Sequence, residues 1–110
     1  MTDASRVADI LERIDRIERA TVGGRVEFFR SEVIQDAVVR NLEVIGEASK
    51  SISPTTRRRY GRIPWKAMAR FRDLAIHHYG HVLTEEVWVI VSRDLVEIRR
   101  QLAKAKVGPV

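Results

Sequence analysis

Residues 72–79 bring together three kinds of side chain that suit phosphate chemistry. They read RDLAIHHY, so an arginine, a histidine and a tyrosine occur within one short segment. The guanidinium of Arg72 is a planar fork of donors that stays charged at physiological pH. The imidazole of His77 can gain or lose a proton near pH 7. The segment is therefore a candidate site for binding and reacting with a phosphate group.

The spacing of Arg72 and His77 sets a geometric condition. An offset of five residues in a continuous α-helix rotates two side chains apart by about 140°, so they would not share a face. Either the helix ends or distorts near Ile76, with Gly80 nearby to permit this, or the functional surface combines two chains around a twofold axis. Both solutions remain open from the residues alone.

The elements that must hold this segment are helical. The apolar residues recur with helical periodicity, and no alternating run is long enough for a strand, so we expect an all-α domain. The first helix is predicted from Asp3 to Ala20, followed by a break at Gly23-Gly24. A second helix is predicted from Val26 to Ile52. Its wide apolar face comprises Phe29, Val33, Ala37, Val38, Leu42, Ile45 and Ala48.

Two prolines and a threonine mark the later elements. Ser53-Pro54 is typical of an N-cap followed by proline at the first helical position, and Pro64 could start another short helix in the same way. Gly80 ends or bends that helix. Thr84 is the expected N-cap of the last helix. The acidic residues at positions 85 and 86 would interact favourably with the positive end of the helix dipole. The predicted inner seam of this helix is Trp88, Val91, Leu95, Ile98 and Leu102.

Composition gives looser bounds on function. The chain has 110 residues, 45% hydrophobic and 32% charged, which indicates one folded domain over residues 1–110. A net charge of +5 favours acidic partners such as nucleic acid. No apolar run is long enough for a membrane span, and the polar N-terminus is unlike a signal peptide. The absence of cysteine fits a cytoplasmic protein.

The pattern Arg-x4-His-x-Tyr at Arg72, His77 and Tyr79 resembles the signature of the HEPN domain family, in particular its HepT-like branch. Other segments extend the resemblance over nearly the whole chain and occur in the same order. They are residues 40–48 (RNLEVIGEA), Pro64-Trp65, residues 87–91 (VWVIV) and Asp94-Leu95.

The resemblance implies a small antiparallel bundle of four to five helices that forms a homodimer, in which two Arg/His motifs face a common cleft. It implies a ribonuclease toxin that needs no metal and no cofactor. The ribose 2′-hydroxyl would attack the adjacent phosphorus, with His77 as general base or acid and Arg72 stabilising the transition state. Polar residues near the cleft would orient these two: Asp73, Asn41, Glu43 and Glu47.

The resemblance also assigns a regulatory role to Tyr79 and names a partner. HepT-like toxins are encoded beside a minimal, MntA-like nucleotidyltransferase antitoxin, which transfers AMP onto the tyrosine of this motif. An adenylate beside an anion-binding arginine adds negative charge and bulk, so it would oppose RNA binding. The alternative is that Tyr79 is a core or interface aromatic residue whose hydroxyl has one partner.

Several basic residues are candidates for RNA binding. The run RRRYGR at residues 57–62 could follow a phosphate backbone, with Tyr60 stacking on a base, or it could be a solvated loop. The RNA-binding candidates are Arg57, Arg58, Arg59, Arg62 and Arg70. His77, His78 and His81 have spacings that can bind zinc, but Gly80 interrupts their face and no cysteine is present, so we expect no metal site.

Two other functions compete with catalysis. The same dimer cleft could bind a nucleotide or an RNA without cutting it, or the chain could be a helical adaptor for a nucleotidyltransferase. The presence of both Arg72 and His77 favours the catalytic hypothesis.

Overall fold

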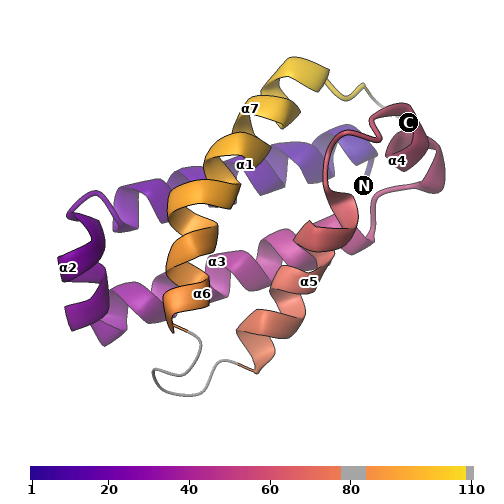
Figure 1. Ribbon diagram of the computed structural model, residues 1–110. Coiled ribbons are helices and arrows are strands. Elements are labelled where there is room, and N and C mark those ends of the chain that lie inside the picture. The colour runs from indigo at the N-terminus through magenta and orange to yellow at the C-terminus, as the bar shows by residue number, and fades with distance from the viewer. Residues whose placement is uncertain (78–83, 109–110) are drawn as a thin grey trace.

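The computed structural model describes residues 1–77 and 84–108, and within these ranges all regular structure is helical (Figure 1). The predicted all-α class is confirmed. The elements are α1 (Asp3–Ala20), α2 (Gly24–Arg30), α3 (Glu32–Lys50), α4 (Pro54–Arg59), α5 (Trp65–Ile76), α6 (Thr84–Val89), the π-helical segment η1 (Ile90–Asp94) and α7 (Leu95–Ala105).

Helix α1 has the predicted bounds because both of its ends carry suitable residues. The Thr2 hydroxyl accepts a hydrogen bond from the Ser5 amide at 3.0 Å and caps the first turn. At the other end, the Thr21 amide donates to the Ile17 carbonyl at 3.0 Å. The apolar residues that α1 buries recur with helical spacing: Val7, Ile10, Ile14 and Ile17.

The predicted single helix from Val26 to Ile52 is wrong, because the chain breaks at Ser31. This residue is extended (φ −119°, ψ 107°) and its side chain accepts a hydrogen bond from the Ile34 amide, so it caps α3. The Gln35 amide group closes the corner by donating to the Phe28 carbonyl at 2.9 Å. Val33, which was assigned to the apolar face, is 79% exposed beside this corner.

Asp3 joins the start of α1 to the start of α4. Its carboxylate is 1% exposed and accepts hydrogen bonds from the Ser53 amide at 3.1 Å, the Ser53 hydroxyl at 2.6 Å and the Thr56 hydroxyl at 2.5 Å. The hydrogen bonds from Ser53 and Thr56 lower the pKa of Asp3, although burial opposes the shift. Because the folded pKa is lowered, the ionised group stabilises the fold at neutral pH, and this contribution is lost as the pH falls through that value.

Helix α5 starts after Pro64, as predicted, and ends at Ile76. The Trp65 indole donates to the Tyr60 carbonyl at 3.2 Å, which fixes the turn before the helix. At the other end, His77 is the C-cap residue, and its backbone (φ −95°, ψ 14°) is no longer α-helical. Of the two solutions to the spacing of Arg72 and His77, the structure shows the helix end near Ile76.

The last helix contains a π-helical segment that the sequence analysis missed. Residues 84–105 run as α6, η1 and α7, and the Ser92 hydroxyl donates to the Trp88 carbonyl at 2.8 Å. The extra residue of a π-turn explains the spacing of the buried positions: Val87 and Ile90 are three residues apart, whereas Leu95 follows Ile90, the first residue of η1, by five residues. Trp88 and Val91 of the predicted seam are only partly buried.

Helix α3 is central to the packing. It lies against α5 and α1, and it runs opposite to α1, while the α6–η1–α7 helix crosses them (Figure 1). Counting α6–η1–α7 as one helix, the described residues contain six helices, one more than the predicted maximum, because the second helix is divided. No described helix is long and apolar enough to cross a membrane.

Candidate functional site

Arg72 lies where α5 comes closest to α3. A Cβ atom on Gly46 would be 2.4 Å from the Arg72 amide nitrogen and 2.7 Å from its Cβ. These distances are well inside van der Waals contact, so only glycine allows this approach of the two helices. The missing side chain of Gly46 therefore determines where the Arg72 backbone sits.

Two carboxylates hold the Arg72 guanidinium. Glu47, the neighbour of Gly46 on α3, forms an ion pair with its Nε, and an Asp73 oxygen lies 3.7 Å from its Nη1. The Arg72 side chain is 34% exposed, so it is partly held by protein and partly open to solvent. Because a guanidinium carries five N–H donors, the other donors can still bind a phosphate. Glu47 and Asp73 thus contact Arg72, and their orienting role stays a prediction.

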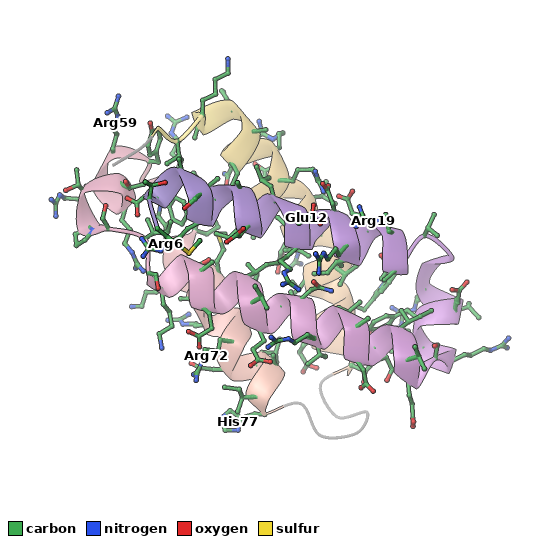
Figure 2. All side chains as sticks on the ribbon, turned by 180° about the vertical axis from the view of Figure 1, so that it is seen from behind. Arg6, Glu12, Arg19, Arg59, Arg72 and His77 are labelled. Carbon is green, nitrogen blue, oxygen red and sulfur yellow. The ribbon has the colours of Figure 1, made fainter. Side chains whose placement is uncertain are left out.

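His77 caps the C-terminal end of α5. Its backbone amide donates to the Asp73 carbonyl at 3.1 Å, and its side chain is exposed. Arg72 and His77 lie along the same edge of the molecule, on the α5 side and away from α1 (Figure 2). The site thus combines a cation anchored on a helix with an accessible imidazole at the end of that helix.

Asn41 and Glu43 have other partners in the structure. The Asn41 amide donates to the Ala37 carbonyl at 2.8 Å and accepts from Arg13 of α1 at 3.2 Å. Glu43 pairs with Arg40 at 3.3 Å. Asn41 thus connects α3 to α1, and no contact within the described residues joins either side chain to Arg72 or His77. Their support of the site stays a prediction.

Arg57 has a structural role that its place in a basic run did not indicate. Its guanidinium donates to the carbonyls of Ser49 at 2.8 Å, Lys50 at 3.2 Å and Ile52 at 3.2 Å. These carbonyls lie at and just beyond the C-terminal end of α3, where backbone acceptors lack helical partners. The Nε and Nη2 groups of Arg57 are thus used within the fold, and its assignment to RNA binding stays a prediction. The other RNA-binding candidates are exposed: Arg58, Arg59, Arg62 and Arg70.

Part of the motif lies outside the described residues. Tyr79, His78 and His81 belong to residues 78–83, so the predictions about them stay predictions. Within residues 1–77 and 84–108, no three His, Asp or Glu side chains are grouped closely enough to hold a metal ion.

Comparison with known proteins gives the same family as the motif. The family described as ribonuclease HepT-like matches residues 10–105, which include Gly46, Arg72 and His77. The chain belongs to the HepT-like ribonuclease family. A protein of Thermococcus cleftensis named "probable ribonuclease HepT" is 39% identical over 99 residues, which cover 89% of this chain and 90% of that protein.

Other relatives of this HepT-like chain are longer. A Methanocaldococcus jannaschii protein named "gamma-glutamylcyclotransferase and putative RNase" is 38% identical over 96 residues, covering 86% of this chain and 43% of that protein. Another protein of this organism, named "putative RNase", is 48% identical over 76 residues, covering 66% of this chain and 63% of that protein. The HepT-like chain thus spans less than two thirds of these two relatives. No solved structure matches it.

Gly46 is the site residue that the sequence analysis missed. A glycine inside a predicted helix lowers helix propensity, so its presence often has a packing reason. That signal was present in the residues 40–48 segment of the HepT-like chain, but sequence alone could not show which helix approaches it. The structure identifies the neighbour as α5 at Arg72.

Replacing Gly46 with alanine tests this close approach. Helix propensity alone predicts that Gly46→Ala stabilises α3 by up to about 1 kcal/mol. We expect the opposite sign, a destabilisation of about 1–3 kcal/mol, because the new methyl group meets the backbone of α5. Urea denaturation followed by circular dichroism measures the difference.

The matched control is Gly61→Ala, whose Cβ would have its nearest neighbour at 3.5 Å, an ordinary contact. The control should change stability by less than about 0.5 kcal/mol. If Gly46→Ala proves as stable as the parent protein, the two helices do not require glycine at this position.

Proposed function

We propose that this HepT-like chain is a metal-independent endoribonuclease and the toxin of a toxin–antitoxin pair. The observation that carries the proposal is the anchoring of Arg72 by Glu47 at the α3–α5 contact, with the exposed His77 at the end of the same helix. Membership of a family of ribonucleases supports it. The names of three relatives, which include ribonuclease or RNase, support it as well.

In the proposed reaction, the ribose 2′-hydroxyl attacks the adjacent phosphorus and the 5′-oxygen leaves. An imidazole of His77 takes the proton from the 2′-hydroxyl or gives one to the leaving oxygen, which contributes roughly 10²- to 10⁴-fold in rate. The free donors of Arg72 stabilise the additional charge on the phosphorane-like transition state. The products are a 2′,3′-cyclic phosphate and a 5′-hydroxyl, and DNA is not a substrate because it lacks the 2′-hydroxyl.

Substitution of the two residues tests the mechanism. Arg72→Ala and His77→Ala should each lower RNA cleavage by about 10²-fold or more in the presence of EDTA. Arg72→Lys should also lose most activity, because lysine keeps the charge but not the planar fork. Gel assays of a labelled RNA give the rates, and thermal melts show that the variants remain folded.

Arg19→Ala is the matched control, because it removes an exposed arginine from α1, far from the site (Figure 2). Its cleavage rate should equal that of the parent protein. Full activity in both Arg72→Ala and His77→Ala, or activity that EDTA abolishes, would contradict the mechanism. RNA binding without any cleavage by the parent protein would favour the non-catalytic alternative.

We propose that the active form is a homodimer in which each cleft uses residues of both chains. Exposed apolar residues remain on the single chain, including Val26 at 63%, Val33 at 79% and Val96 at 59%. Arg72 and His77 both lie at the surface, where a second chain can reach them. A twofold axis would then pair Arg72 of each chain with His77 of the other chain in two equivalent clefts.

Mixing two inactive variants tests the shared cleft. When Arg72→Ala and His77→Ala chains exchange subunits, half of the dimers are mixed, and one of the two clefts in each mixed dimer is complete. We therefore expect recovery of about a quarter of the parent rate. Light scattering should give a mass near twice 12.6 kDa. A mixture that stays inactive, or a fully active monomer, would refute the shared cleft.

We further propose that an MntA-like nucleotidyltransferase silences this toxin by transferring AMP from ATP to Tyr79. The support is sequence spacing, because Tyr79 follows His77 by two residues in the family motif. An adenylate there adds about one negative charge beside Arg72 and would compete with RNA phosphate.

Co-expression with the neighbouring transferase tests the modification. Mass spectrometry should find AMP on the peptide that contains Tyr79, and the modified protein should lose its activity. The chain has two tyrosines, so Tyr60→Phe is a matched control that should still be modified, whereas Tyr79→Phe should escape both modification and silencing. Complete silencing without any adduct would indicate sequestration by the antitoxin instead.

A further inference from the structure

A basic groove lies between α4 and α7, at the end of α5 opposite to His77. Arg59 at the end of α4 and Tyr60 and Arg62 in the turn that follows line one side, and α7 contributes Arg100 and Lys104. The hollow has a volume of about 400 Å³ and no acidic residue lines it. Nothing in the Arg/His motif or in the proposed chemistry uses this surface.

The wall formed by the turn is held rigidly in place. The Tyr60 carbonyl accepts hydrogen bonds from the Ile63 amide at 3.1 Å and from the Trp65 indole at 3.2 Å. Ile63 and Trp65 are buried in the core. Because the turn is already ordered, a ligand would lose little further conformational entropy in binding there.

The charges in the groove are available to an anion. Arg62 and Lys104 are exposed, and no acidic side chain of the described residues pairs with either of them. The Arg59 guanidinium carbon lies 5.6 Å from the centre of the Tyr60 ring, a cation–π contact that leaves its N–H donors available. Arg100 is different, because Glu97 binds it through Nε and Nη2.

We infer that this groove binds the phosphate backbone of the substrate RNA at a distance from the cut. An open groove with separate cations and a tyrosine is the arrangement that follows a single strand without reading its bases. Helix α5 separates the groove from His77 by about 18 Å, which corresponds to about five nucleotides of a stacked strand. The inference rests on the proposed function, since the ligand is the RNA to be cleaved.

The experiment removes two positive charges from the groove and compares this variant with a control variant that loses two positive charges elsewhere on the surface. The groove variant is Arg62→Gln with Lys104→Gln, and the control variant is Arg19→Gln with Arg30→Gln on α1 and α2. Arg19 and the groove residue Arg59 lie at opposite ends of the molecule (Figure 2). All four substituted side chains are exposed, so both variants should fold. Both carry His77→Ala, so that the probe is not consumed.

Fluorescence anisotropy with a labelled single-stranded RNA of about 20 nucleotides gives the dissociation constant and its dependence on salt. The groove variant should bind about tenfold more weakly than the His77→Ala parent, and the control less than about twofold more weakly. The slope of log K against log salt should fall by about 1.4 for the groove variant, since each single-strand phosphate contact contributes about 0.7.

The result also separates this inference from the proposed activity. If the parent protein cuts no RNA but the groove variant still loses affinity for the probe, the proposed activity fails and the groove stands as a binding site. If the groove variant binds the RNA as well as the control does, the groove is refuted, whatever the cleavage assay shows.

Discussion

The close contact between α3 and α5 is the constraint on which the site depends. Gly46 removes the side chain that would keep the helices apart, and the next residue, Glu47, then reaches Arg72. A guanidinium on a long side chain would otherwise lose much rotamer freedom when it binds a phosphate. The ion pair with Glu47 restricts the Arg72 rotamers already in the folded protein, so the guanidinium is oriented before a ligand binds. One backbone approach therefore determines both the packing and the direction of the functional cation.

The end of α5 gives the imidazole a different environment from the cation. Arg72 lies within the helix, between two carboxylates, whereas His77 is the cap residue with an exposed side chain. This difference suits their proposed roles. An electrostatic stabiliser works best when it is fixed in advance, while a proton-transfer group must reach an oxygen of a ligand that enters from solvent. The short distance along the chain keeps both groups on one element without forcing them onto one helical face.

The sequence predicted those parts of the fold that depend on local signals. The bounds of α1, the start of α5 after Pro64 and the all-helical class follow from capping residues and periodicity. The break at Ser31 had a local signal, a serine before Glu32, but the continuous apolar pattern concealed it. The π-turn at Ile90–Asp94 and the partners of Arg57 had no such signal. Gly46 indicated a packing reason, but periodicity does not specify which distant helix approaches it.

The net charge of +5 is distributed unevenly over the described surface, and this matters more than its size. Several arginines pair with acids on the same or neighbouring helices, such as Arg16 with Glu12 and Arg99 with Asp15 and Glu18. Their fields are largely cancelled at the distance of an approaching polyanion. Within the described ranges, six exposed arginines have no acidic partner: Arg58, Arg59, Arg62 and Arg70 on α4, the following turn or α5, and Arg19 and Arg30 on α1 and α2. Four of the six thus belong to the part of the chain that ends at His77, and in the proposed function a strand attracted to them would lie along the path to the imidazole.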